Sequence, residues 1–94
     1  MSNQPLFPLG KTVATPGAIE ALDSADETAI ELFLRHQSGD WGGTLDPEDV
    51  AANDQAVKEG GRILSAYILS NDTKVWIITE WDRSVSTILL PSEY

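Results

Sequence analysis

The sequence predicts an α+β fold in which about three short helices precede a three-stranded antiparallel β-meander, with the helices packed on one face of the sheet. Two helix start signals, Thr15-Pro16 and Asp46-Pro47, combine an N-capping residue with a proline at the first helical position. Beyond Gly61, three runs rich in β-branched and aromatic residues follow one another. The connectors between these runs are short, and short connectors favour antiparallel neighbours.

At 94 residues the chain is predicted to form a single domain, 1–94. Residues 1–11 are spaced by proline and glycine, and we expect an extended N-terminal arm that Leu6, Phe7 and Leu9 hold against the body. Residues 12–14 are predicted to form a short edge strand.

The first helix is predicted to span roughly 16–25, and the second to run from about Asp26 to Gln37, before Gly39 ends it. Apolar side chains that recur every three or four residues mark the buried stripe of a helix. On this basis, the residues expected to face the core are Ile19 and Leu22 in the first helix and Ile30, Phe33 and Leu34 in the second.

The third helix is predicted to begin at Asp46, continue to about Glu59 and end at Gly60-Gly61. Its first acids follow the N-cap directly, where they face the positive end of the helix dipole. Only small apolar residues line its inner face, so we expect it at the surface of the fold; they are Val50, Ala51, Ala56 and Val57.

The predicted meander consists of residues 62–69, 74–81 and 84–90. Apolar side chains alternate onto both of its faces. We therefore expect the helices to cover one face, and the other face to be either covered as well or available to a partner. Trp76 is expected in the core, whereas Trp41 and Trp81 are candidates for aromatic anchors at an interface.

Acidic residues are concentrated in the middle of the chain, whose formal net charge is −9. The segment from Glu20 to Gly60 has Arg35 and Lys58 as its bases, and its acids are Glu20, Asp23, Asp26, Glu27, Glu31, Asp40, Asp46, Glu48, Asp49, Asp54 and Glu59. Such a field repels nucleic acid and attracts basic clefts. We therefore expect the partner to be a host protein with a basic surface, with no direct binding to nucleic acid or membrane. The residues expected to contact the partner are Asp40, Trp41, Asp46, Glu48, Asp49, Glu59 and Trp81.

The chain has no cysteine, which excludes disulfides, thiolate zinc sites and cysteine nucleophiles. Its N-terminus lacks the regions of an export signal, and its apolar runs are too short to cross a bilayer, so we expect a soluble, cytoplasmic protein. The acids around Asp46 do not have the spacing of a calcium loop, and there is no phosphate loop or dinucleotide fingerprint. We expect no metal and no cofactor.

A catalytic interpretation rests on the single histidine, His36, together with Arg83 and Thr87. A helix with a histidine packed on a meander with arginine and threonine resembles, in coarse outline, the small ribonuclease fold of barnase- and colicin-type toxins. The resemblance implies a nuclease that uses these three residues, or a degenerate relative. Six basic residues against fifteen acidic ones are unfavourable for binding a polyanion, so we rank an enzyme second. We expect His36 to cap its helix instead, and Arg83 to pair with Glu80 or Asp82.

Several short stretches carry a further resemblance: Thr15-Pro16-Gly17-Ala18, Arg35-His36, Ser38-Gly39-Asp40-Trp41-Gly42, Leu64-Ser65-Ala66-Tyr67, Trp76-Ile77-Ile78-Thr79-Glu80, Asp82-Arg83-Ser84, Thr87-Ile88-Leu89-Leu90-Pro91 and the terminal Tyr94. Through them, residues 15–94 resemble a family of small, uncharacterised acidic proteins encoded on bacterial plasmids, phages and other mobile elements. The resemblance implies a mobile-DNA context, in which small acidic proteins act as inhibitors of host defence of the anti-CRISPR or anti-restriction type. A homo-oligomeric accessory protein, joined as a homodimer through the sheet edge or the exposed face, is the remaining alternative.

Overall fold

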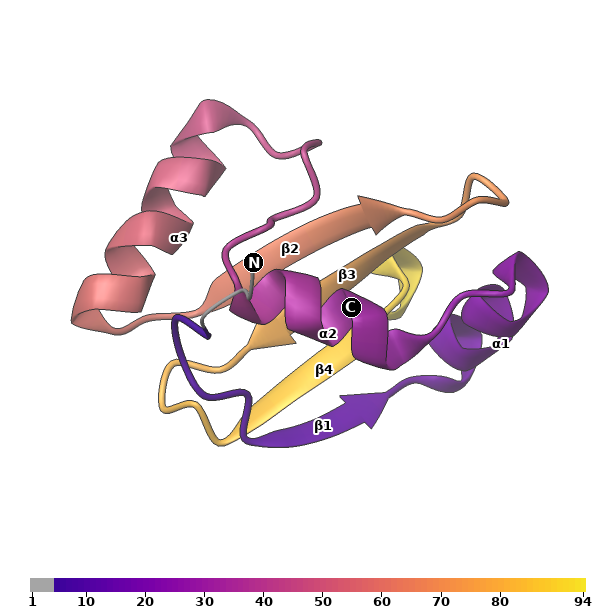
Figure 1. The fold of residues 1–94 in the computed structure, drawn as a ribbon, viewed down its shortest axis with the longest axis horizontal. Helices are drawn as coiled ribbons and strands as arrows, with labels where there is room; N and C mark the ends of the chain where they lie inside the picture. Colours follow the sequence, from indigo (N-terminus) through magenta and orange to yellow (C-terminus); the bar gives the residue numbers. More distant parts are fainter. Residues whose placement is uncertain (1–4) are drawn as a thin grey trace.

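A four-stranded mixed sheet, in the strand order β1-β4-β3-β2, forms the centre of the structure (Figure 1). The structure is a computed structural model and describes residues 5–94. Along the chain its elements are β1 (Lys11–Ala14), α1 (Pro16–Ala25), α2 (Ala29–Gln37), α3 (Pro47–Glu59), β2 (Ile63–Ile68), β3 (Lys74–Thr79), β4 (Val85–Leu89) and the 3₁₀ turn η1 (Pro91–Glu93). The predicted α+β class is confirmed. None of the helices in this part of the chain has the length and apolar character needed to cross a membrane.

The predicted meander is confirmed as β2, β3 and β4, which pair antiparallel in sequence order. The prediction of a three-stranded sheet was wrong in one respect, because β1 joins the sheet as a fourth strand. It pairs in parallel with β4, from Lys11 opposite Val85 to Ala14 opposite Ile88. An edge strand was predicted at 12–14, but the strand with which it pairs was not predicted. Helices and strands separate β1 from β4 along the chain, so no turn signal could reveal this pairing.

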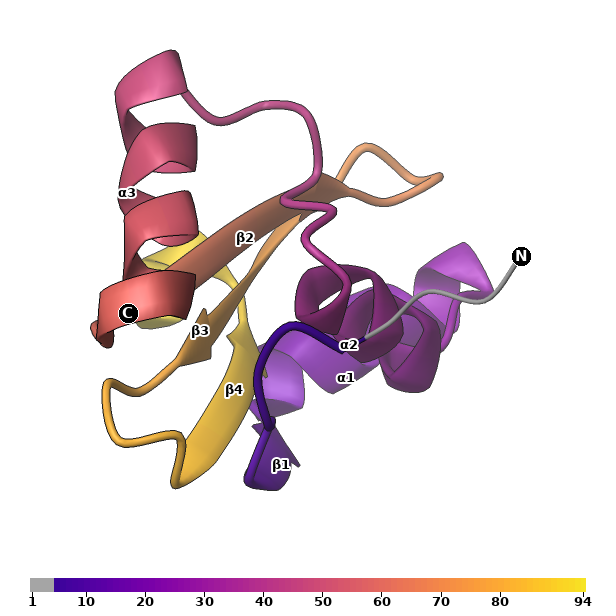
Figure 2. The same ribbon diagram turned by 60° about the vertical axis from the view of Figure 1, so that its left-hand side comes forward.

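Helices α1 and α2 cover one face of the sheet (Figures 1 and 2). Because strand side chains alternate between the faces, this face carries Tyr67, Val75, Ile77 and Ile88, which are buried against the helices. The residues that the two helices contribute to this main core are Ala18, Leu22, Ala25, Leu32 and Phe33.

Helix α2 is rotated relative to the orientation predicted from its apolar residues. Leu32, Phe33 and His36 are buried, whereas Ile30 is 61% exposed and Leu34 is 55% exposed. The prediction treated His36 as a capping residue at the helix end. Its burial instead brings the side of the helix formed by residues 32, 33 and 36 inward. The two aliphatic residues predicted to be buried are thereby turned outward.

A second, smaller core lies beside α3, where the N-terminal arm packs on the body. Phe7 of the arm is 6% exposed, and the buried residues that complete its cluster are Trp41, Ala56 and Ile63. Leu9 contacts both cores, while Leu6 remains 47% exposed. Phe7 and Leu9 thus attach the described part of the predicted arm. Its first residues, 1–4, lie outside the described residues.

Helix α3 closes the outer edge of β2. Its Asn53 side chain is 4% exposed; it donates from Nδ2 to the Leu64 carbonyl at 2.7 Å and accepts the Leu64 N–H at 3.1 Å. Further along, the Ala66 N–H donates to the Trp41 carbonyl at 3.1 Å, and the Ala66 carbonyl accepts the Thr44 hydroxyl at 3.4 Å. These bonds occupy the outward backbone groups of Leu64 and Ala66, which protects this part of the β2 edge from pairing with another strand. As predicted, α3 lies at the periphery of the fold (Figure 2).

The other face of the sheet is partly covered by the C-terminal residues 91–94. The ring of Tyr94 meets that of Trp76 edge-on, with centroids 5.8 Å apart, and its hydroxyl accepts a hydrogen bond from Arg62 at 2.8 Å. A hollow of about 250 Å³ remains there, lined by Arg62, Leu64, Trp76, Ile78 and Tyr94. Trp76, predicted in the core, is therefore half-buried on this face.

The start of α1 is tied to the same C-terminal segment. Thr15 caps the helix by accepting the Ala18 N–H, as its place before Pro16 predicted. The Thr15 hydroxyl donates to Glu93 Oε1 at 2.5 Å, and Glu93 Oε2 accepts the Gly17 N–H at 3.1 Å. The hydrogen bond from Thr15 is the main reason why the pKa of Glu93 lies below its usual value.

Candidate functional site

The acidic residues of the α3 segment lie at the surface. Those that are exposed are Asp46, Glu48, Asp49, Asp54 and Glu59. The ion pairs found within residues 5–94 join Arg35 to Asp40 and Arg62 to Glu80, and neither involves α3. The negative charge of this helix is thus not neutralised by a basic side chain of the described fold, and it is available to a partner.

Two of these acids lie on the same solvent-exposed side of α3. Glu48 and Glu59 lie three helical turns apart with Gln55 between them, and the Gln55 amide donates to the Glu59 carboxylate at 3.5 Å. Asp46 has the extended backbone of an N-cap, yet its side chain makes no capping hydrogen bond. Its carboxylate therefore adds to the acidic surface rather than to the helix end.

Arg83 joins the β3–β4 turn to the end of α3. Arg83 lies in the left-handed region with φ +60°. Its guanidinium donates to the carbonyls of Ala56 at 2.8 Å, Gly61 at 2.5 Å and Glu80 at 3.2 Å. The prediction of an ion pair with Glu80 or Asp82 was wrong, because Nη1 and Nη2 of Arg83 donate to partly buried backbone carbonyls instead. The carbonyls of Ala56 and Glu80 also accept the backbone N–H groups of Gly60 and Arg83, so the guanidinium adds a second hydrogen bond to each of them.

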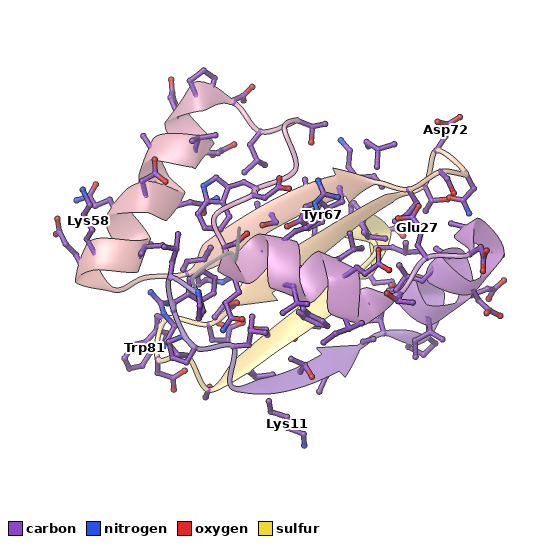
Figure 3. The ribbon with its side chains drawn as sticks, in the orientation of Figure 1. Lys11, Glu27, Lys58, Tyr67, Asp72 and Trp81 are labelled. Carbon is purple, nitrogen blue, oxygen red and sulfur yellow. The ribbon has the colours of Figure 1, made fainter. Side chains whose placement is uncertain are left out.

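Trp81 stands in this turn, two residues before Arg83, and is 69% exposed. Figure 3 shows it on the same side of the molecule as Lys58 of α3. An exposed aromatic side chain therefore lies beside the acidic helix, and Arg83 holds the two segments together.

Trp41 was predicted as an aromatic anchor, and the structure places it inside the fold instead. Its side chain is 6% exposed and packs against the rings of Phe7 and His36, at centroid distances of 6.4 and 5.8 Å. The flanking glycines suggested an exposed loop, but they serve a close approach to β2. A Cβ on Gly42, which has φ +101°, would lie 1.7 Å from the Ala66 carbonyl oxygen. Trp41 therefore has no free surface to offer a partner.

Asp40 is accessible but already paired. Its carboxylate accepts the Arg35 Nε–H at 2.7 Å and the Gly42 N–H at 3.1 Å. The bond from Arg35 is the main cause that lowers the pKa of Asp40, and the same bond raises the pKa of Arg35. Both side chains are about half exposed, at 47% and 46%, so the pair contributes little to stability and removes one charge from the acidic surface.

His36 lies in the core within a chain of buried polar groups. Its Nδ1 is 2.5 Å from Ser65 Oγ, and its Nε2 is 2.9 Å from Thr79 Oγ1. Thr79 Oγ1 is 2.6 Å from Ser86 Oγ, which donates to the Leu9 carbonyl at 2.7 Å. His36 is 0% exposed and bonds to both β2 and β3, so the prediction that it caps its helix was wrong.

The end of this chain determines which groups donate. Ser86 gives its proton to the Leu9 carbonyl, so it accepts from Thr79, and Thr79 in turn accepts from His36 Nε2–H. Nδ1 is then the acceptor for the Ser65 hydroxyl. A neutral imidazole satisfies every partner, and burial lowers the pKa of His36 to about 3. His36 is therefore uncharged at neutral pH, with both nitrogens occupied and no access to solvent.

The three residues of the nuclease interpretation do not meet. His36 contacts the helix-covered side of the sheet, which Ser86 and Ile88 also face. Thr87 lies between these two residues in β4 and therefore faces the opposite side. Arg83 is held at the turn by backbone carbonyls. No phosphate could contact all three side chains, and the geometry gives the nuclease interpretation no support.

Two polar features escaped the sequence analysis. Asn53 was the one polar residue on the inner face of α3, and Ser65, Thr79 and Ser86 occupy buried, inward positions of the strands. A polar residue at an inward position was the signal that could have identified each of them. Within residues 5–94, no three His, Cys, Asp or Glu side chains come together as the ligands of a metal ion.

Of the residues predicted to contact a partner, those that are exposed and outside the ion pairs of the described chain are Asp46, Glu48, Asp49, Glu59 and Trp81. Comparisons of this chain with protein-family models, with curated proteins and with solved structures gave no match.

Proposed function

We propose that this protein is a non-enzymatic binding protein whose acidic α3 surface attaches to a basic surface of a partner protein. The α3 surface consists of Asp46, Glu48, Asp49, Asp54, Glu59 and Trp81. The observation that carries the proposal is that its five acids are exposed and make no ion pair within the described chain.

The two kinds of side chain on this surface have different tasks. Exposed charges mainly accelerate encounter with an oppositely charged surface, and their effect is screened by salt. A large aromatic side chain that becomes buried on contact supplies affinity. Trp81 fits the second task because, at 69%, it is the most exposed large hydrophobic residue among residues 5–94, and because the Arg83 guanidinium donates to its carbonyl at 3.4 Å.

The density of negative charge distinguishes an acidic patch that fills one basic cleft from a surface that imitates a DNA duplex. Helix α3 has 13 residues, a length of roughly 20 Å. Duplex DNA of that length carries about twelve phosphates, more than twice the acids of the α3 surface. A cleft that recognises a few phosphates is therefore a better match than a surface that tracks a long duplex.

The partner we propose is a host defence protein whose basic cleft faces nucleic acid, so that this protein acts as an anti-CRISPR or anti-restriction inhibitor in the cytoplasm. The charge of the α3 surface supports a basic cleft. The resemblance to proteins of plasmids and phages supports a partner in host defence.

The test is capture of bacterial proteins on the immobilised chain, with two charge-matched variants. The first variant carries Glu48→Lys, Asp49→Lys and Glu59→Lys on α3. The control carries Glu20→Lys, Asp23→Lys and Glu31→Lys on α1 and α2, all at exposed positions. Each reversal removes two negative units, so three reversals bring the net charge of both variants from −9 to −3.

We expect the wild type and the control to retain one basic, nucleic-acid-binding protein that duplex DNA displaces, and the α3 variant to lose it. Trp81→Ala should weaken the same complex by increasing its dissociation rate. Equal loss in both charge variants would show that only overall charge matters, and retention by the α3 variant would exclude this surface. Circular dichroism confirms beforehand that each variant is folded.

A further inference from the structure

The two edges of the sheet differ in how their backbone is bonded. At the β2 edge, Asn53, Trp41 and Thr44 bond to the outward backbone groups of Leu64 and Ala66. At the opposite edge, no helix or strand among residues 5–94 lies beyond β1 (Figures 1 and 2). Side chains and a loop thus protect this part of the β2 edge, whereas the β1 edge has no neighbouring element in the described part of the chain and can accept a further strand.

The outward groups of β1 belong to Thr12 and Ala14. The N–H groups of Lys11 and Thr15 donate to carbonyls of the β4 segment, each at 3.0 Å. Residues alternate in direction along a strand, so the intervening Thr12 and Ala14 direct their N–H and C=O groups away from β4. Two residues with four backbone groups are therefore arranged for a further strand.

We propose that β1 pairs antiparallel with β1 of a second copy of this chain, about a two-fold axis at Val13, and joins two four-stranded sheets into one. The register follows from the outward groups. With Val13 opposite Val13 of the partner, Thr12 lies opposite Ala14 on both sides of the axis, and all the outward groups of both strands are bonded.

Neighbouring registers are less complete. An axis at Thr12 would set Ala14 opposite Gly10, whose φ of +67° is not that of a strand. An axis at Ala14 would set Thr12 opposite Pro16, which has no N–H to donate. The edge of β1 is self-complementary in one register.

The side chains beside β1 support a second copy as the occupant. On the helix-covered side, a hollow of about 380 Å³ is lined by Ala14, Ile19, Leu22, Asp23, Glu27 and Ala29. Ile19 was predicted to be buried and is 56% exposed here. In the proposed register the partner's Thr12 lies beside Ala14, at the mouth of this hollow. Pairing therefore brings the two exposed Ile19 side chains toward the axis and removes apolar surface from water.

The charges on the other side of the strand are also complementary. Lys11 is exposed, and it takes part in neither of the ion pairs found within residues 5–94. In the proposed register it lies opposite the partner's Thr15, at the roughly 5 Å spacing of cross-strand side chains. The hydroxyl of Thr15 is bonded to Glu93. The long Lys11 side chain therefore reaches the partner's Glu93, and the same contact forms twice in the dimer.

Val13→Cys tests the axis, because the natural chain has no cysteine. Residues on the axis form a non-hydrogen-bonded pair with Cα atoms about 4.5 Å apart, within the range that a disulfide spans. We expect mild oxidation to convert Val13→Cys to a disulfide-linked dimer. The control is Thr12→Cys, which faces Ala14 of the partner rather than itself and should stay largely uncrosslinked. Equal crosslinking of the two variants, or none in either, overturns the proposal.

Sedimentation equilibrium of the cysteine-free chain gives an independent measurement. Thr12→Pro removes an N–H that β1 does not use toward β4, and we expect it to weaken dimerisation at least tenfold, whereas Thr12→Val retains the N–H and should not. Lys11→Glu should also weaken the dimer, while Lys74→Glu, an equal charge change at an exposed position of β3, should leave it unchanged. The proposal is overturned if the chain is monomeric at every concentration. This includes the case in which β1 pairs with a strand of another protein instead of a second copy. None of these readouts involves the α3 surface, so that outcome would leave the proposed function standing.

Discussion

At the scale of single residues, burial decides the chemistry of His36. An exposed histidine titrates near neutrality, whereas His36 is enclosed by Ser65 and Thr79, which bond to both ring nitrogens. These hydroxyls can bond to the neutral ring without any nearby carboxylate, so nothing compensates the cost of charging it. The His36 side chain therefore links helix α2 to the sheet and makes the stability of the fold depend on pH.

We predict that acid destabilises the protein through His36. Its pKa is about 3 in the fold, against 6.5 in the unfolded chain, so the unfolded state binds more protons between these values. The free energy of unfolding therefore falls as the pH is lowered from 6.5 toward 3, by a total on the order of 4 kcal/mol. Urea denaturation across this range measures the loss.

The control for this prediction is His36→Gln, which has no titrating ring. Carboxylates titrate in both proteins, so only the difference between their pH profiles belongs to His36. Proton NMR provides a second measurement that does not depend on the stability of the variant. Ring resonances of the folded wild type that titrate with a midpoint near 6.5 would contradict the prediction.

Arg83 offers a second residue-scale prediction, because two effects oppose each other there. Asp72 and Arg83 both have a left-handed backbone, with φ of 65° and 60°. Replacement by glycine relieves about 1 kcal/mol of strain at either position. Arg83→Gly also removes the donors to Ala56 and Gly61, and we expect a net loss of about 1–3 kcal/mol. Asp72→Gly, in an exposed turn, should be neutral or slightly stabilising; equal effects in thermal denaturation would show that the Arg83 hydrogen bonds contribute little.

At the scale of elements, the local sequence specifies some parts of the fold. Other parts depend on contacts between segments that are distant along the chain. Each run of the meander carries its own β-forming residues and ends in a turn, so its pairing order could be predicted. The partner of β1 and the rotation of α2 could not be predicted. The first depends on β4, far along the chain, and the second on hydroxyls of β2 and β3 that form hydrogen bonds with His36. At the candidate surface, the exposure of the α3 acids could be predicted from their charge. The prediction was wrong at Trp41, where glycines that permit close packing resemble glycines of a free loop.

The attachment of α3 to β2 gives a prediction at this scale. Asn53→Leu has a similar volume but leaves the N–H and C=O of Leu64 without partners in a partly buried position. An unpaired buried group costs about 1–3 kcal/mol, and we expect a loss of that order or more in chemical denaturation. Gln55→Leu, on the exposed side of the same helix, should change stability by less than about 0.5 kcal/mol. Comparable losses in the two variants would show that Asn53 does not hold α3 in place.

At the scale of the whole molecule, charge and shape are distributed unequally. The strand order places α3 at the β2 edge and leaves β1 at the opposite edge. In a dimer formed through β1, the two α3 surfaces therefore lie at the far ends of a continuous sheet. Such an arrangement could engage two sites of one assembly, and linked sites raise the effective affinity without any new contact.

The net charge of −9 leads to a prediction about salt. With the ion pairs of residues 5–94 limited to two, most acids repel one another in the compact state. Sodium chloride screens this repulsion, so we expect the melting temperature to rise as salt is added from low ionic strength to about 0.5 M. The Glu20→Lys, Asp23→Lys, Glu31→Lys variant, at −3, should show a smaller rise. A wild-type melting temperature that falls with salt would indicate that attractive pairs dominate instead.

The central position of β4 has a consequence for how the protein folds during synthesis. This strand lies between β1 and β3, and it is the last of the four strands to leave the ribosome. Until residues 85–89 emerge, β1 has no neighbour, and the β2–β3 hairpin presents a bare inner edge to the cell. The sheet can therefore be completed only after residues 85–89 have emerged, and until then the earlier strands stay accessible to chaperones and proteases.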